Sequence, residues 1–176
     1  NIMGCLDQPN KGSYLLDGRD VARLSRSDLA DVRGKMIGFV FQSFNLLSRT
    51  SALENVEMPL MYQGIGARER HKRAIAALER VSLGTRFDHH PNQLSGGQQQ
   101  RVAIARALVT DAPVIMADEP TGNLDTKTGE GIHALIADLN ARLGITAVVV
   151  THNERLAQSL PRRLRLRVGR LEGDTL

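Results

Sequence analysis

The sequence contains no tryptophan and a single cysteine, Cys5. One cysteine cannot form a disulfide within the chain, so the composition is compatible with a reducing compartment. Aromatic residues make up only 3% of the chain, which leaves few rings on which nucleic-acid bases could stack. Because the net charge is also only +4, we expect the basic residues to form solvated surface and we expect no nucleic-acid partner.

Long hydrophobic runs are missing as well. No stretch approaches the roughly 20 apolar residues that a membrane-spanning helix needs. Residues 1–6 are too short for a signal peptide and lack its basic flank. We therefore expect any role at a membrane to depend on a partner protein. With 176 residues and 41% hydrophobic content, the chain can bury a core of ordinary size in one domain.

An unusual helix start lies near the middle of the chain. Ser95 is a natural N-cap, and Gly96 and Gly97 let the backbone approach another group closely. No acidic residue lies between Asp88 and Asp111, although acidic residues usually offset the dipole in the first turn of a helix. The positive potential is left for an external anion such as phosphate. Taken alone, Ser-Gly-Gly before a helix is also common as an ordinary loop and cap.

Three short apolar runs, residues 36–41, 114–117 and 145–151, have the pattern of buried parallel strands. A helix with apolar residues at helical spacing separates the last two runs and is closed by Gly144. Such short connections imply parallel strands that are joined by a right-handed crossover.

Each apolar run ends in polar residues, namely Gln42, then Asp118 and Glu119, then His152. Ligands of open α/β sheets bind at the carboxyl ends of the strands, so we expect these side chains to meet there. Successive side chains on a strand point in opposite directions, so Asp118 and Glu119 should have different roles unless the strand turns. One carboxylate could hold Mg²⁺ and the other could orient or deprotonate an attacking water. A lone histidine at a strand end is more often structural.

The remaining segments give a coarser picture. Residues 14–18 predict a strand and a turn, residues 25–32 a capped helix, and residues 67–81 a helix within a helical insertion of about 60 residues. Residues 1–6 have the pattern of the end of a helix. Residues 162–170 alternate arginine with leucine or valine, which predicts a basic C-terminal edge strand.

The glycine-rich helix start and the polar strand ends together resemble the ATP-binding-cassette (ABC) ATPases. Five motifs of that family occur in the family's order: the Q-loop glutamine at Gln42, the signature at residues 94–98, the Walker B strand at residues 114–119, the D-loop at residues 123–125 and the switch histidine at His152. The resemblance covers essentially the whole chain. It is strongest to the branch that contains macrolide exporters and lipoprotein-release ATPases.

The resemblance implies an α/β fold with a P-loop NTPase-like core of parallel sheet, incomplete at the N-terminus, and an inserted helical subdomain. Residues 1–176 would form a single ABC-type ATPase domain. Within it, residues 43–105 would form the helical and signature subdomain, and residues 106–176 the part of the core from Walker B to the switch histidine.

In this family two subunits sandwich two ATP molecules in a head-to-tail dimer. The resemblance implies that Ser95, Gly97 and Gln98, with Gly96 between them, bind the γ-phosphate of the ATP held by the second ATPase subunit. Asp125 would act across the dimer interface.

The strand-end residues also take roles by resemblance. Asp118 would hold Mg²⁺, Glu119 would be the catalytic base, and His152 would support the γ-phosphate and the attacking water. Gln42 would sense the metal site and relay its state to an integral membrane subunit, whose coupling helix docks near residues 43–59. Such an ATPase lies on the cytoplasmic face of the bacterial inner membrane, where it powers export or lipoprotein release.

Two other functions stay open at this point. One is a soluble ABC ATPase that acts on nucleic acid or ribosomes, but such proteins usually carry long coiled coils or a duplicated cassette, and the sequence has neither heptads nor repeats. The other is a non-catalytic regulatory or interaction module of the same fold. Glu119 and His152 argue against an inactive module, whereas the absence of the family's phosphate-binding loop argues for one.

One family motif does not occur in the sequence. It is the Walker A loop, G-x-x-x-x-G-K-[S/T], which cradles the phosphates of ATP. In the family this loop directly precedes a segment that resembles residues 1–6, so we expect the chain to begin just after it.

Residues 1–176 by themselves should therefore bind ATP very weakly and hydrolyse almost none. The lysine and the serine or threonine of Walker A make most of the direct contacts to ATP within one subunit. Isothermal titration calorimetry on this polypeptide measures the affinity directly, and a micromolar dissociation constant would contradict the expectation.

Overall fold

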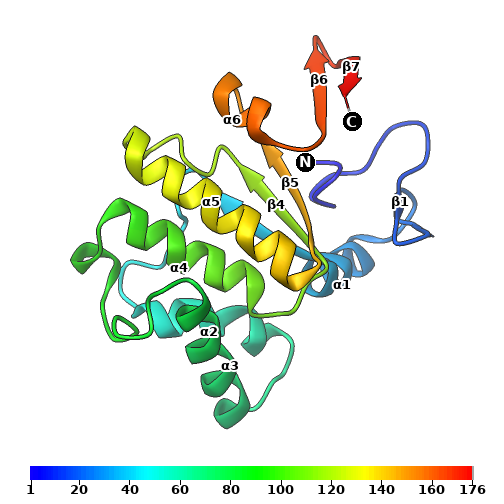
Figure 1. Ribbon diagram of the computed structural model, residues 1–176. Coiled ribbons are helices and arrows are strands. Elements are labelled where there is room, and N and C mark those ends of the chain that lie inside the picture. Colours follow the sequence, from blue (N-terminus) through cyan, green and yellow to red (C-terminus); the bar gives the residue numbers. More distant parts are fainter. Residues whose placement is uncertain (176) are drawn as a thin grey trace.

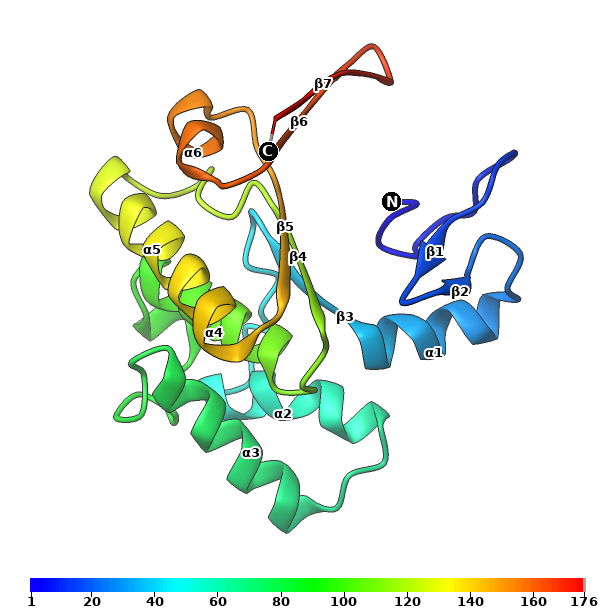
Figure 2. The ribbon, with the colours of Figure 1, turned by 45° about the vertical axis from the view of Figure 1, so that its right-hand side comes forward.

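The computed structural model describes residues 1–175, and its centre is a three-stranded parallel sheet (Figures 1 and 2). The strands lie in the order β3 (Ile37–Phe41), β4 (Val114–Asp118) and β5 (Thr146–Val150). Phe41 pairs with Asp118, and Asp118 pairs with Val150, so the carboxyl ends of the three strands are level. The predicted parallel strands are confirmed, and the residues that follow them leave the sheet at one edge.

Two helices lie side by side on one face of this sheet (Figure 2). They are α4 (Gly96–Leu108), which packs on β3, and α5 (Thr126–Leu143), which packs on β5. Helix α4 approaches β3 so closely that a Cβ atom on Gly38 would overlap the backbone carbonyl of Ala107. Glycine is therefore needed at this position for the helix to seat on the strand.

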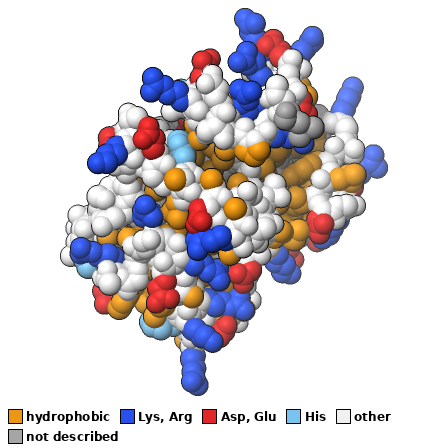
Figure 3. Space-filling view, in the orientation of Figure 1, with side chains coloured by type: hydrophobic (Ala, Val, Ile, Leu, Met, Phe, Trp, Pro, Cys, Tyr) orange, Lys and Arg blue, Asp and Glu red, His pale blue; other side chains and the backbone are white. Residues whose placement is uncertain are grey.

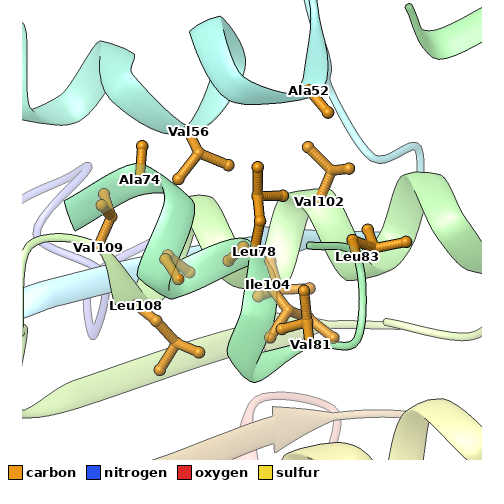
Figure 4. Close-up of a cluster of buried hydrophobic side chains, with 14 of the residues drawn as sticks. Ala52, Val56, Ala74, Leu78, Val81, Leu83, Val102, Ile104, Leu108 and Val109 are labelled. Carbon is orange, nitrogen blue, oxygen red and sulfur yellow. The ribbon is translucent and has the colours of Figure 1, made fainter. Parts of the chain in front are cut away.

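A layer of helices lies beyond α4. Helices α2 (Ala52–Tyr62) and α3 (Ala67–Arg80) pack against each other and against α4. Side chains of α2, α3 and α4 make up much of the larger hydrophobic core, in which Leu78 of α3 and Ile104 of α4 are fully buried (Figure 4). Between β3 and β4 the described chain contains only helices, which confirms the predicted helical insertion.

Local capping explains several helix boundaries. Ser25 caps α1 (Arg26–Met36), and its side chain accepts a hydrogen bond from the Asp28 N–H. This helix was expected from the cap, but it continues to Met36, four residues beyond the predicted end. Gly144 adopts the left-handed conformation directly after α5 and ends that helix as predicted.

The smaller elements lie around the sheet. The strand and turn predicted for residues 14–18 are confirmed, and they belong to a hairpin of β1 (Leu15–Leu16) and β2 (Arg19–Asp20). A 3₁₀ turn covers Pro91–Gln93, and the short helix α6 covers Glu154–Ser159. Among the described helices, none combines the length and the hydrophobicity that crossing a bilayer requires.

Residues 1–6 form turns with the hydrogen-bond pattern of a helix end, as predicted. The Leu6 N–H bonds to the Asn1 carbonyl, and the Cys5 N–H bonds to the Ile2 carbonyl. Cys5, with a φ of 54°, has the left-handed conformation in which helices commonly end.

The predicted basic edge strand is corrected by the structure. Strand β6 (Arg163–Arg167) pairs with β7 (Arg170–Thr175) in a separate antiparallel hairpin and does not join the parallel sheet. Val168 and Gly169 both have positive φ values, which suits a tight two-residue hairpin turn. The chain therefore folds back on itself at a point where the alternating pattern alone suggested one continuous strand.

Replacing Leu78 by alanine should destabilise the protein by about 2–5 kcal/mol, because it leaves a cavity between three helices. The free energy of unfolding in urea measures this effect. Leu143 at the end of α5 is 39% exposed and provides the control, since Leu143→Ala should cost less than about 1 kcal/mol. Equal losses in the two variants would show that the helical layer is not the main core.

Candidate functional site

Glu119 lies at the centre of the polar edge of the sheet. Its Oε1 accepts a hydrogen bond of 2.7 Å from the His152 N–H and lies 2.6 Å from Nδ1 of the same residue. Its Oε2 accepts a bond of 3.1 Å from the Thr151 hydroxyl. Both oxygens of the carboxylate are thus held by the end of β5, which confirms that the ends of β4 and β5 meet.

The backbone at Glu119 makes this arrangement possible. Glu119 has a φ of 44°, while its N–H still bonds to the Val150 carbonyl at 2.9 Å. The left-handed conformation is unfavourable for a residue with a Cβ atom, and such strain is typical of functional positions. The chain therefore leaves the sheet at Glu119 itself.

Asp118, the neighbouring carboxylate, has a different environment. Its side chain is exposed and forms no hydrogen bond or ion pair with the residues that the structure describes. The two adjacent carboxylates are therefore distinguished by their surroundings. Across residues 1–175, no group of three or more histidine, cysteine or acidic side chains is arranged to hold a metal ion.

Gln42 follows β3 and faces the turn that follows β4. Its Nε2 donates to Oδ1 of Asn123 at 3.2 Å, and Nδ2 of Asn123 donates back to the Gln42 carbonyl at 3.1 Å. The side chain of Gln42 also packs against Gly122. The third strand end is thereby joined to the same site.

The start of α4 has the predicted cap. The Ser95 hydroxyl accepts a hydrogen bond from the Gln98 N–H at 3.3 Å, and the Gln98 side chain accepts one from the Ser95 N–H at 2.9 Å. The first turn of the helix contains no acidic residue. The helix thus keeps an N-terminal positive potential that could bind an anion.

Gly97 is required by a contact within the chain. A Cβ atom at this position would lie 2.5 Å from Cγ2 of Thr128, so only glycine lets α4 and α5 approach this closely. Gly96 lies next to Leu124 in the turn before α5. The turn from Glu119 to Asp125 therefore touches the start of α4 and, through Asn123, the end of β3.

Asp125 is the N-cap of α5. Its carboxylate accepts a hydrogen bond of 3.0 Å from the Thr128 N–H. Hydrogen bonds from Thr128 lower the pKa of this exposed carboxyl below its usual value. The side chain is therefore ionised and well oriented at neutral pH.

Two contacts of the site were not predicted from the sequence. The Thr151 hydroxyl donates to Oε2 of Glu119, and the Asn123 side chain exchanges hydrogen bonds with the side chain and the carbonyl of Gln42. Thr151 directly precedes His152 at the end of a predicted strand, and this position could have indicated it. Asn123 belongs to the segment that matches the D-loop, but only the tertiary structure shows its contact with Gln42.

The surroundings of the site are open and basic on one side. A cavity of about 740 Å³ lies beside His152, between α6 and the β6–β7 hairpin. Figure 3 shows arginine and lysine side chains gathered over this hairpin at the top of the molecule. Three arginines of β6 line the cavity, namely Arg163, Arg165 and Arg167. The cavity is therefore positively charged on the hairpin side.

Comparison with known proteins agrees with this geometry. The family model described as "ABC transporter" matches residues 1–122. An uncharacterized ABC transporter ATP-binding protein of Thermotoga maritima is 57% identical over 173 residues, which cover 98% of this chain and 74% of that protein. The macrolide export ATP-binding/permease protein MacB 1/2 of Paracoccus denitrificans is 52% identical over 99% of the chain. The chain spans only 26% of that longer protein.

Solved structures show the same fold. The dimeric post-hydrolysis state of the ATP-binding cassette MJ0796, bound to ADP and Pi, matches with a TM-score of 0.86 at 46% sequence identity. The match covers 99% of this chain and 77% of that one. These findings confirm the resemblance that the five sequence motifs indicated and the fold that it implied. The chain therefore belongs to the ABC transporter family, as one of its ATPase cassettes.

Proposed function

We propose that this ATPase hydrolyses ATP at the polar edge of the sheet and thereby powers a membrane transporter of the macrolide-export or lipoprotein-release type. The observation that carries this proposal is the position of Glu119, which the end of β5 holds by both carboxylate oxygens at a strained turn. The relatives named for macrolide export support the transporter branch.

Glu119 acts as the general base in this proposal. Hydrogen bonds from Thr151 and His152 fix the carboxylate, so that it can accept a proton from an attacking water without first reorienting. Nδ1 of His152 lies 2.6 Å from Oε1 of Glu119. When both nitrogens of this exposed ring carry protons, Nδ1 donates to Glu119 and Nε2 can donate to a phosphate oxygen. The histidine therefore links the base to the phosphate that is attacked.

The residues present fit a magnesium ion only together with phosphate oxygens. Asp118 offers one free carboxylate, and Gln42 adds an amide oxygen at the neighbouring strand end. Mg²⁺ is usually held by one or two carboxylates together with substrate phosphates and water, which matches this sparse set. Asp118 and Gln42 would hold the ion, which when bound would neutralise charge on the phosphate oxygens.

Changing Glu119 to glutamine should lower the rate of ATP hydrolysis by about 10²- to 10⁴-fold, because the amide cannot accept the proton. ATP binding should remain, since the side chain keeps its size and loses only its charge. Phosphate release and nucleotide binding are measured on the protein expressed from its complete gene. Glu154→Gln, in the first turn of α6, is the matched control, and hydrolysis by Glu119→Gln within a few fold of the unaltered protein would refute this role.

The second part of the proposal concerns a dimer. The start of α4 presents Ser95, Gly96, Gly97 and Gln98 with a positive helix end and an exposed cap. These groups suit the γ-phosphate of an ATP molecule that the second subunit holds, and Asp125 would lie at the same interface. The solved relative described as dimeric and bound to ADP and Pi supports this arrangement.

Mixed dimers test which subunit supplies the start of α4. Ser95→Asp preserves a capping residue, but it places a carboxylate where the phosphate would bind. If each site combines Glu119 of one subunit with Ser95 of the other, a dimer with Glu119→Gln in one subunit and Ser95→Asp in the other retains one intact site.

A dimer with both substitutions in the same subunit retains no intact site. Covalently linked dimers of both kinds should therefore differ in ATP hydrolysis, with the first kind more active. The opposite order would mean that Ser95 and Glu119 of one subunit serve the same ATP molecule.

The third part concerns the membrane subunit. A groove of about 330 Å³ lies between β3 and α2, and its lining includes Phe41, Met58 and Pro59. It adjoins Gln42, so a partner bound along residues 43–59 would contact the segment that senses the metal site.

Several relatives are named as ATP-binding/permease proteins, which supports a membrane partner and a peripheral position on the cytoplasmic face of the bacterial inner membrane. In this proposal residues 43–105 form the subdomain that receives the partner, and residues 106–176 carry the catalytic part.

A further inference from the structure

Helix α4 carries a buried polar side chain in the middle of its apolar face. Gln100 is 0% exposed, although its neighbours Val102 and Ala103 belong to the hydrophobic core. Its Nε2 donates to the Pro120 carbonyl at 2.5 Å and to the Phe41 carbonyl at 3.3 Å. One amide group thus binds the backbone at the ends of two different strands.

These two carbonyls adjoin the residues of the site. Phe41 directly precedes Gln42, and Pro120 directly follows Glu119. Ser95 lies five residues before Gln100 on the same helix, about 7.5 Å along its axis. Gln100 therefore connects the helix end that suits an anion to the two strand ends that carry the glutamine and the base.

A second side chain of α4 holds the same region. Arg106 donates from Nη1 to the Asn45 carbonyl at 2.6 Å and from Nη2 to the Phe44 carbonyl at 2.9 Å. Phe44 and Asn45 both have positive φ values, 59° and 50°, so the segment after Gln42 is held in an unfavourable conformation. Burial lowers the pKa of the Arg106 guanidinium below its usual value.

The amide of Gln100 is not fully satisfied. Its Oε1 is buried and has no hydrogen-bond partner among the described residues, which is a costly arrangement for a side chain that serves only packing. An apolar side chain of similar length would remove this unpaired oxygen and would leave the Pro120 carbonyl unpaired instead. The Phe41 carbonyl would keep its bond of 3.3 Å from the Phe44 N–H. The number of unpaired groups would not change, so the pairing of buried polar groups alone gives no reason for an amide here.

We propose that Gln100 is a positioning residue, which holds the backbone at Gln42 and at Glu119 in a fixed relation to the start of α4. Binding of an anion at Ser95 would displace this end of the helix. The side chain of Gln100 would transmit that displacement to both strand ends. The inference rests on the proposed function for the roles of Gln42, Glu119 and Ser95. The contacts of Gln100 themselves do not depend on those roles.

The first test needs no ATP. Gln100→Met replaces the amide by an apolar chain of similar length, and Gln99→Met is the matched control, because the Gln99 amide bonds only to the Leu94 carbonyl beside its own helix. Hydrogen–deuterium exchange of peptides covering residues 42–47 and 119–125 should become faster in Gln100→Met and stay unchanged in Gln99→Met. The melting temperature should shift by only a few degrees. Unchanged exchange in both segments of Gln100→Met would overturn the inference.

The second test separates positioning from binding. In the protein expressed from its complete gene, Gln100→Met should lower kcat for ATP hydrolysis about 10- to 100-fold, because small displacements of catalytic groups have effects of that size. The KM for ATP should stay within about threefold. A large fall in melting temperature with unchanged kcat per folded molecule would assign Gln100 a purely structural role and overturn the inference.

Gln100→Glu gives a pH-dependent readout. A neutral carboxylic acid can donate one hydrogen bond to the Pro120 carbonyl, whereas the ionised form can donate none and is repelled by both carbonyls. Burial favours the neutral acid. The kcat of Gln100→Glu relative to the unaltered protein should therefore rise as the pH falls from about 8 to about 6, and that of Gln99→Glu should not.

A flat ratio for Gln100→Glu would contradict the positioning role, even if Gln100→Met failed to fold. A wrong proposed function would give a different experimental result. The unaltered protein would then show no ATP hydrolysis, while the exchange experiment on residues 42–47 and 119–125 would still report on Gln100.

Discussion

The level carboxyl ends of the three parallel strands are the constraint on which the site depends. Because Phe41, Asp118 and Val150 share one register position, the residues after them leave the sheet at the same height. Glu119 can then place both carboxylate oxygens against the end of β5. A slip of one residue between β4 and β5 would turn the side chains of β4 to the other face of the sheet and separate Glu119 from His152.

Helix α4 joins this edge to the rest of the molecule. One part of its surface packs into the core with α2 and α3, and another seats on β3 at Gly38, where no larger residue fits. The same helix begins at Ser95 with an uncompensated positive end and carries Gln100 and Arg106, which bind backbone carbonyls around Gln42. Since a helix is stiff over this length, the helix start at Ser95, the core and the sheet edge are mechanically one unit.

Much of the architecture could be predicted because the relevant signals are local. The spacing of apolar residues predicted α5, and Ile132, Ile136 and Leu139 are indeed buried. The cap at Ser95 and the three buried strands were equally visible in short stretches of sequence. The predicted edge strand failed where Val168 adopts a positive φ value, which residue preference alone would not suggest.

The sequence by itself determined the three core strands, the helical segments between them and which polar residues follow each strand, because hydrogen-bonding caps and hydrophobic periodicity act over a few neighbouring residues. Its motifs also indicated the family. Only the tertiary structure decided which atoms meet. Glu119 contacts His152 across 33 positions, Gln42 contacts Asn123 across 81, and Gln100 reaches the Phe41 carbonyl across 59. Contacts at such separations depend on strand register and on how closely α4 packs against the sheet, and neither is encoded in any short stretch of the chain.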